Sequence, residues 1–185
     1  MTLAIVILIV VLLIIILIYN SLVGKKNQVL NVFGTIDALL KKRYDLIPNL
    51  VATVKGYMQH ERALLTEVTE MRAKATSETI SDDQKIDLDN KITKALSSIM
   101  LAVENYPDLK ASGNFMHLQK TLTELEEQIS AARRAYNAAV TDYNNAVEMF
   151  PTNLVASMVN YKRRKFFEIS EKERETVDAG KAFKT

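Results

Sequence analysis

Residues 3–19 of the chain read LAIVILIVVLLIIILIY, an uninterrupted apolar run that ends in a tyrosine. A helix rises about 1.5 Å per residue, so this run, extended by Leu22 and Val23, is long enough to cross the roughly 30 Å hydrocarbon layer of a bilayer. A helix without a polar face presents no surface to water, which argues against a helix of a soluble domain. We therefore predict a membrane-spanning helix over residues 1–23. The residues that we assign to the span and its interface are Leu3, Ile9, Ile16 and Tyr19.

A cleavable signal peptide is the main alternative for such an N-terminal run. It would carry basic residues before the apolar core and small residues at a cleavage site after it. Here no Lys or Arg precedes the run, and the flanking sequence YNSLV at 19–23 is a poor cleavage site. A retained anchor is therefore favoured over a cleaved leader.

The charges that flank the run orient it. The first basic side chains after the span are Lys25 and Lys26, followed by Lys41, Lys42 and Arg43, whereas the short N-terminal side carries only its amino group. Because Lys and Arg are enriched on the cytoplasmic side of membrane helices, we expect the N-terminus outside and the rest of the chain in the cytoplasm. This topology describes a single-pass protein whose first partner is the lipid bilayer.

The composition of the chain excludes several classes of protein. Among its 185 residues, 24 Lys and Arg stand against 22 Asp and Glu, a balance that argues against a nucleic-acid partner. The absence of cysteine excludes disulfide scaffolds, thiolate zinc sites and cysteine catalysis. With only five Gly and three Pro, the chain does not suit an all-β fold or a phosphate-binding glycine loop.

Beyond the span, apolar residues recur at helical spacing. The clearest helix is predicted over 114–150, where the spacing alternates between three and four residues as in a coiled coil. A shorter helix is predicted over 82–105, where Ser81 and Gln84 fit a capping box at its start. A short helix follows over 152–161.

Residues 24–75 carry a third apolar stripe, interrupted by Pro48. A proline usually ends or kinks a helix, so two helices joined by a tight hairpin are one interpretation. The stripe nevertheless keeps its phase past the proline, which favours one long helix over 24–75 with a kink at Pro48. The predicted fold is therefore all-α: a transmembrane helix that continues into an antiparallel bundle of long helices over residues 24–161.

The unequal lengths of these helices suggest self-association. A helix from the membrane to residue 75 would be roughly 80 Å long, whereas the 82–105 helix would be about 36 Å long. The apolar stripe over 29–40 would then need cover from the 114–150 helix, from the tail or from neighbouring copies of the chain. Since a membrane tether also concentrates copies in two dimensions, we expect a homo-oligomer.

No pattern of catalytic or metal-binding residues stands out. His60 and Glu61 begin an H-E-x-x-H motif, but the second histidine is absent. Neither His60 nor His117 follows a glutamate by three residues, so the pairs of a di-iron bundle are absent too. The aspartates at 82–89 lack the Gly and Glu of a calcium loop. We expect no catalytic residues, no cofactor, no metal and no small-molecule substrate.

Arg43 and Glu61 project close to the centre of the apolar stripe of the predicted long helix. Charges in such places need a partner or water. The two residues would be about 27 Å apart on one helix and could not pair with each other. Arg133, at the edge of the 114–150 stripe, is therefore the candidate partner of Glu61. The alternative is that Arg43 and Glu61 lie at solvent or subunit boundaries and extend their charges into water.

The charged tail over residues 162–185 begins with a basic and aromatic run. Its members are Lys162, Arg163, Arg164, Lys165, Phe166 and Phe167. Such a run can contact anionic lipid, and four charges in a near-neutral chain are weak support for nucleic acid. The alternative is a solvated tail with one of the two phenylalanines folded onto the bundle.

Several stretches resemble the sequence signatures of the LemA family. They are RYDLIPNLV at 43–51, KGY at 55–57 with HE at 60–61, ARRAYN at 132–137, YNNA at 143–146 with FP at 150–151, and YNSLV at 19–23. The resemblance covers nearly the whole chain and is loose over 76–90 and the last 20 residues. It implies a bacterial membrane protein with a helical cytoplasmic domain, no established enzymatic activity and relatives linked to magnetosome membranes.

These expectations combine into one functional hypothesis. The chain is a membrane-anchored helical bundle that acts as an oligomeric scaffold or membrane-organising module at the bacterial inner membrane. The alternative is an adaptor that presents a helical face to another membrane protein, such as a protease or a sensor. An enzyme is disfavoured, because no convergent set of polar residues is visible in the sequence.

The anchor can be tested by extraction. We expect the chain to stay in the membrane pellet through an alkaline carbonate wash and to be released by detergent, because its N-terminal run is apolar on every side. A matched variant with Ile9→Arg and Leu12→Arg should be released by the wash, since each central arginine costs about 2.5–3.5 kcal/mol of insertion free energy. Recovery of the unaltered chain in the soluble fraction, or a mature chain that begins beyond Val23, would contradict the prediction.

Overall fold

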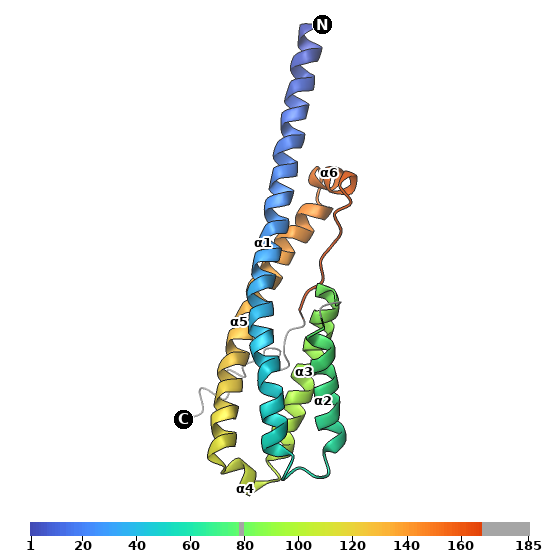
Figure 1. Ribbon diagram of the computed structural model, residues 1–185. Helices are drawn as coiled ribbons and strands as arrows, with labels where there is room; N and C mark the ends of the chain where they lie inside the picture. The colour runs from blue at the N-terminus through green and yellow to red at the C-terminus, as the bar shows by residue number, and fades with distance from the viewer. Residues whose placement is uncertain (78–79, 168–185) are drawn as a thin grey trace, which may run out of the picture.

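The computed structural model of the chain, which describes residues 1–77 and 80–167, consists of helices joined by short connections (Figure 1). The helices are α1 (Thr2–Val54), α2 (Arg62–Ala75), α3 (Asp82–Val103), α4 (Pro107–Lys110), α5 (Gly113–Glu148) and α6 (Thr152–Met158). α1 stands alone at its N-terminal end and then joins α2, α3 and α5 in an antiparallel bundle, with α4 at the far end. The predicted all-α class is confirmed.

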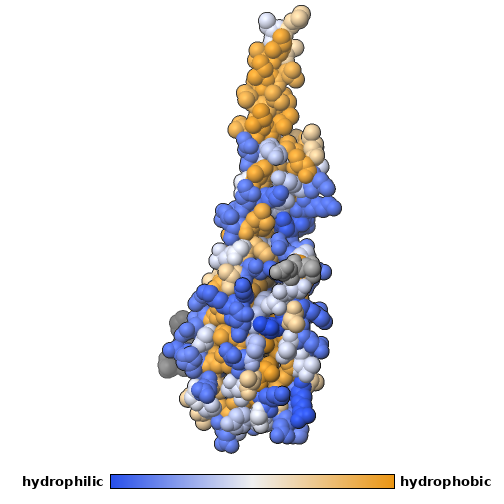
Figure 2. All heavy atoms as spheres, in the orientation of Figure 1, coloured by the Kyte–Doolittle hydropathy of each residue, from blue (hydrophilic) through white to orange (hydrophobic). Residues whose placement is uncertain are grey.

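The apolar run at the N-terminus forms the free part of α1. The side chains of Leu3, Ile9, Ile16 and Tyr19 are all exposed, and no other element in the described part of the chain covers the most apolar stretch. Figure 2 shows it as a continuous hydrophobic sheath that projects from a mostly hydrophilic body. The helix is long and apolar enough to cross a membrane, and is therefore compatible with the predicted anchor.

α1 passes through Pro48 without a break. A proline within a helix leaves the carbonyl four residues earlier without its usual donor, and this carbonyl belongs to Tyr44. Arg72 Nε on α2 donates a hydrogen bond of 3.0 Å to it, and the same guanidinium lies 3.8 Å from the Asp45 carboxylate. A side chain of the neighbouring helix thus replaces the missing backbone donor, so the buried carbonyl keeps a partner.

The prediction of one helix over 24–75 is wrong beyond Val54. The chain reverses over residues 55–61, and α2 returns beside α1. Gly56 lies in this turn, and Met58 is fully buried in the core. The apolar spacing continued almost in phase because α1 and α2 bury their apolar faces in the same core, so spacing alone does not distinguish a continuing helix from a reversed one. The buried residues of α2 are Leu65, Val68, Met71 and Ala75.

The other predicted helices form with small changes at their ends. The helix predicted over 82–105 is α3, and its capping box is present: Ser81 Oγ accepts a 3.3 Å bond from the Gln84 N–H, and Gln84 Oε1 accepts a 2.9 Å bond from the Ser81 N–H. The helix predicted over 114–150 is α5, and the one predicted over 152–161 is the shorter α6.

The membrane-proximal stripe of α1 is covered within one chain. The four residues that point inward from it, Val29, Phe33, Ile36 and Leu40, are buried. The ring of Phe33 lies 5.8 Å from that of Tyr136 on α5, and Phe167, which follows α6, packs against Tyr136 at 5.2 Å. We expected α5, the tail or neighbouring copies to cover this stripe. The cover is provided by α5 and by the start of the tail. The length argument for neighbouring copies therefore no longer applies.

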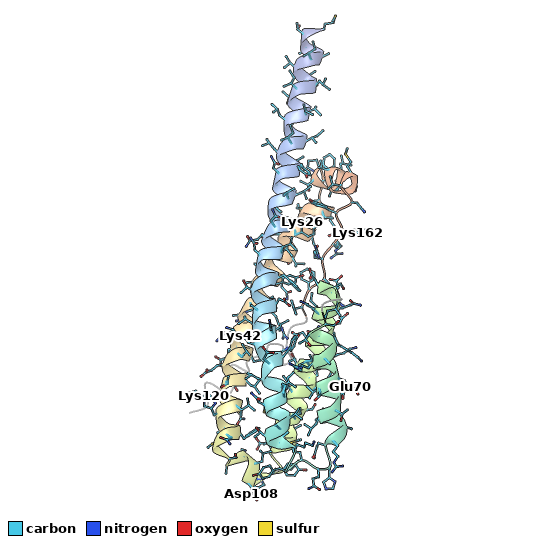
Figure 3. The ribbon with its side chains drawn as sticks, viewed as in Figure 1. Lys26, Lys42, Glu70, Asp108, Lys120 and Lys162 are labelled. Atoms are coloured by element: carbon cyan, nitrogen blue, oxygen red, sulfur yellow. The ribbon has the colours of Figure 1, made fainter. Side chains whose placement is uncertain are left out.

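The reversal at 55–61 can be tested by distance measurement. Lys42 on α1 and Glu70 on α2, both labelled in Figure 3, would be about 42 Å apart on one continuous helix. We expect spin labels at Lys42→Cys and Glu70→Cys to lie well below that distance, because α2 returns beside α1. The chain has no other cysteine. The control pair, Lys120→Cys and Glu148→Cys on α5, has the same separation in sequence and should give about 42 Å. Equal distances for the two pairs would contradict the reversal.

Candidate functional site

The described residues contain no cluster that suggests metal chemistry. Among residues 1–77 and 80–167, no group of three His, Cys, Asp or Glu side chains is placed to bind a metal ion. His60 lies in the turn after α1 and His117 near the start of α5, and both are exposed. The polar features of this part of the chain are instead a buried charge network and a basic face near the N-terminal run.

The buried charge network joins α1, α3 and α5 through Asp89. Asp89, on α3, is completely buried, and its two carboxylate oxygens contact Arg43 Nη2 on α1 and Arg133 Nη2 on α5. Arg43 Nη1 donates bonds of 2.7 Å to Glu126 Oε2 and 3.0 Å to Thr93 Oγ1. Arg133 Nη2 donates to the same Thr93 hydroxyl at 3.1 Å. Two guanidinium groups therefore share one buried carboxylate and one hydroxyl.

The charges of this network balance. Two arginines face the buried carboxylate of Asp89 and the partly exposed carboxylate of Glu126, so the network carries no excess charge when all four groups are ionised. Burial lowers the pKa of Arg43, and the Glu126 carboxylate opposes this shift. Arginine nonetheless stays protonated at neutral pH, because a guanidinium group is not deprotonated in proteins. Taking such groups out of water costs several kcal/mol per ion, so the network stabilises the fold only as a complete set.

Two tyrosines next to the network stay neutral. Burial raises the pKa of Tyr44, which follows Arg43 on α1, to about 12. Burial likewise raises the pKa of Tyr136 on α5 to about 12. Both phenols therefore stay neutral even well above neutral pH, and Tyr44 adds no negative charge beside Arg43.

The predicted pairing of Glu61 with Arg133 is wrong. Because the chain reverses after Val54, Glu61 lies at the start of α2, at the far end of the bundle, where it is half-buried. Its carboxylate accepts bonds of 2.9 and 3.1 Å from the hydroxyl of Tyr106, and this bond raises the pKa of Tyr106. Of the three candidate polar residues, Arg43 and Arg133 are buried and meet through Asp89.

Sequence reasoning missed Asp89. It lay among the aspartates at 82–89, which resemble a solvated start of a helix. A signal was nevertheless present: Asp89 is three residues from both Ile86 and Ile92, so it falls within the apolar stripe of α3 and is buried with them.

The basic and aromatic run is attached to the bundle by two asparagines of α5. Asn144 donates to the Arg164 carbonyl at 3.0 Å and accepts from the Arg164 N–H at 2.8 Å. Asn137 makes the same pair of bonds with Phe167, both at 3.0 Å. Phe167 is buried, with the Arg133 guanidinium 5.6 Å from its ring centre. The predicted lipid contact of Phe167 is therefore wrong, and the alternative, a phenylalanine folded onto the bundle, is confirmed.

Three charged members of the run contact acidic residues of α5 and α3. Arg163 lies 3.1 Å from Glu148, and Arg164 lies 3.6 Å from Asp82. Lys165 contacts Asp87. The side chains of Lys162 and Phe166 are exposed, and residues 168–185 lie outside the described part of the chain.

A basic depression lies between this run and α1. It has a volume of about 480 Å³, and its cationic lining residues are Lys26, Lys162, Arg163 and Arg164. Lys26 Nζ lies 4.8 Å above the ring of Tyr161. Figure 3 shows Lys26 and Lys162 at nearly the same level, just below α6.

The sequence model of the LemA family matches residues 32–179. The chain belongs to the LemA family. Protein LemA of Metamycoplasma hominis is 28% identical over 159 residues, which is 86% of this chain and 73% of that protein. Two magnetosome proteins match a shorter part. MamQ 2 of Paramagnetospirillum magneticum is 32% identical over 80 residues, and MamQ of Magnetospirillum gryphiswaldense is 29% identical over 79 residues; each match covers 43% of this chain and 29% of the relative.

Family membership confirms the resemblance seen in the sequence, and with the relatives it indicates a membrane-associated helical protein. The buried network of Arg43, Asp89, Glu126 and Arg133 lies entirely within the part that matches the LemA family, whereas the N-terminal run precedes it. The match to the family therefore spans the helical bundle.

Removing the central carboxylate tests the network. We expect Asp89→Asn to lower the free energy of unfolding in detergent by about 3–5 kcal/mol, because two buried arginines lose their shared charge. The control, Asp87→Asn, removes an exposed partner of Lys165 and should cost at most about 1 kcal/mol. Denaturant titrations followed by circular dichroism give both values, and equal stabilities of the two variants would contradict the assignment.

Proposed function

We propose that this LemA-family chain is a membrane-anchored scaffold of a bacterial inner membrane. The N-terminal helix spans the bilayer once, with its N-terminus outside, and the bundle projects into the cytoplasm. Several copies associate, and the scaffold organises the membrane surface without catalysing a reaction. The association of copies rests on the concentration that a membrane tether gives in two dimensions. The following observations support the anchor, the rigid positioning of the bundle and its location.

The observation that carries the proposal is the continuity of α1. This single helix of 53 residues includes both the apolar run and one wall of the bundle, so no flexible linker separates the two. Leu22, just beyond the run, is completely buried against Val155 and Ala156 of α6, which braces the helix where it leaves the bundle. Such a connection fixes the direction of the bundle relative to the span, as a positioning role requires.

The buried charge network supports the same role. Asp89 binds one arginine from α1 and one from α5, and such a polar contact is satisfied at one register of the three helices and not at its neighbours. A scaffold needs a surface of constant shape. A network that penalises sliding of the helices gives the bundle that property.

Charge and similarity support the location. The basic residues nearest to the span, Lys25, Lys26 and Lys162, all lie on the side of the bundle, as expected for a cytoplasmic domain. The similarity to magnetosome proteins over 80 residues supports a role at a membrane structure.

A second candidate function is an adaptor that presents its helical surface to another membrane protein, such as a protease or a sensor. The observation that favours it is the self-contained core. The stripe over 29–40 is buried by α5 and by the segment that ends at Phe167, so this stripe needs no second copy to cover it.

The mass of the purified particle separates the two functions. We expect chains extracted in mild detergent to form a particle whose protein mass is a fixed multiple of 20.9 kDa, measured by light scattering coupled to size exclusion. The mass should not change on dilution, because a specific assembly is held by protein contacts rather than by a shared micelle. A particle of 20.9 kDa, or a one-to-one complex with another protein, would overturn the scaffold and support the adaptor.

A further inference from the structure

The corner where α5 meets α6 carries a cluster of exposed apolar side chains. Met149 is 62% exposed, Phe150 78%, Leu154 58% and Met158 81%. Large apolar side chains that cluster on a surface usually mark a contact with another apolar body. We therefore expect another apolar surface to cover this corner.

The corner lies level with the end of the apolar run of α1. Val155 and Ala156 of α6 pack against Leu22, and Ile18 packs partly buried against the same group. Ile18 and Leu22 are the last turns of the stretch that is long enough to span a bilayer. Figure 1 shows α6 beside α1 where α1 leaves the bundle, and Figure 2 shows hydrophobic atoms over α6 next to the lower end of the hydrophobic sheath.

α6 is apolar on two faces. Val155 and Ala156 point inward to α1, while Leu154 and Met158, four residues apart, share an outer face. A soluble surface helix shows one apolar face and one polar face, and a helix that is apolar all round is normally buried. The inner face of α6 is covered by protein, so the outer face requires a second apolar environment.

A cationic layer lies directly below this corner. The depression of about 480 Å³ is lined by Lys26, Lys162, Arg163 and Arg164 and by one acidic residue, Asp83, next to Tyr161, so cations outnumber carboxylates in its lining. Asn144 fixes the backbone at Arg164 through two hydrogen bonds, and Lys26 rests on the ring of Tyr161, so the cations are held near one another. From the span downward, the order is apolar side chains and then cations, which matches the order of acyl chains and anionic headgroups in one leaflet.

We propose that the α5–α6 corner is a second membrane contact of this protein. Met149, Phe150, Leu154 and Met158 enter the acyl layer of the leaflet through which α1 leaves the bilayer, and the cations around the depression contact anionic lipid headgroups. The occupant is the bilayer because the corner is continuous with the span. The inference rests on the proposed anchoring by α1 and adds a second point of attachment beside it.

A single tryptophan can report the depth of the corner, since the chain has none of its own. The full chain is reconstituted into vesicles of phosphatidylcholine and phosphatidylglycerol whose acyl chains are brominated, because bromine quenches only fluorophores within the acyl layer. The reporter is Phe150→Trp. Leu12→Trp, within the span, marks full quenching. Leu101→Trp, 74% exposed on the part of α3 near α4, is the matched apolar control outside the membrane.

We expect Phe150→Trp to lose its emission as strongly as Leu12→Trp, and Leu101→Trp to keep its emission. If Leu12→Trp is quenched and Phe150→Trp behaves like Leu101→Trp, this inference is overturned while the anchor stands. If Leu12→Trp itself is not quenched, the proposed anchoring fails first. A blue-shifted but unquenched Phe150→Trp would overturn the inference in favour of a second copy of the chain on the corner.

Lipid charge tests the second half of the proposal. In vesicles that contain phosphatidylglycerol, Phe150→Trp should be quenched more strongly than in vesicles of phosphatidylcholine alone. The double variant Lys26→Gln and Lys162→Gln in the Phe150→Trp background should remove this difference. Equal quenching in the two lipids before any lysine is changed would overturn the headgroup contact.

Discussion

The structure depends on one carboxylate that two arginines share. Asp89 lies between Arg43 and Arg133 in the centre of the bundle, so α1, α3 and α5 meet through a single buried group. Apolar contacts tolerate small shifts between helices, whereas a buried ion pair that is pulled apart leaves charges without water or a partner. A network of this kind generally adds little to stability compared with an apolar core of the same volume, and the role that we propose for it is to favour one register of the three helices.

At two other places in the bundle, a side chain supplies hydrogen bonds that the backbone lacks. Pro48 removes a backbone donor from α1, and the side chain of Arg72 supplies another. The segment after α6 forms no helix or strand in its described part, and Asn137 and Asn144 pair with its backbone as a neighbouring strand would. In each case a side chain from a neighbouring helix forms hydrogen bonds that the local backbone cannot form by itself. Backbone N–H and C=O groups can therefore be buried there without losing their hydrogen-bond partners.

Periodicity in the sequence predicts the all-α fold, the apolar run, α3 and α5, because an apolar stripe at helical spacing is a property of one element alone. Periodicity does not predict whether the next helix continues in the same direction or turns back, because a returning helix buries the same kind of apolar stripe. Gly56 alone is a weak signal for a turn. The reversal at 55–61 was therefore missed. The stripes single out Arg43 as a charge within one apolar face and Arg133 as a candidate partner at the edge of another, but the same reasoning also selects Glu61, which lies at the far end of the bundle. The shared partner of Arg43 and Arg133 could not be identified in this way, because pairing depends on how three helices are placed in space.

Because α1 is one unbroken helix, it also sets the distance between α6 and the far end of the bundle. From Leu22, where the helix leaves α6, to Val54, where it ends, it rises by about 48 Å. The turn after Val54 and the short helix α4 thus form a tip at a set distance from α6. In the proposed orientation, a partner that binds this tip must reach it about 48 Å from the point where α1 leaves α6, so the length of α1 sets the reach that such a partner needs.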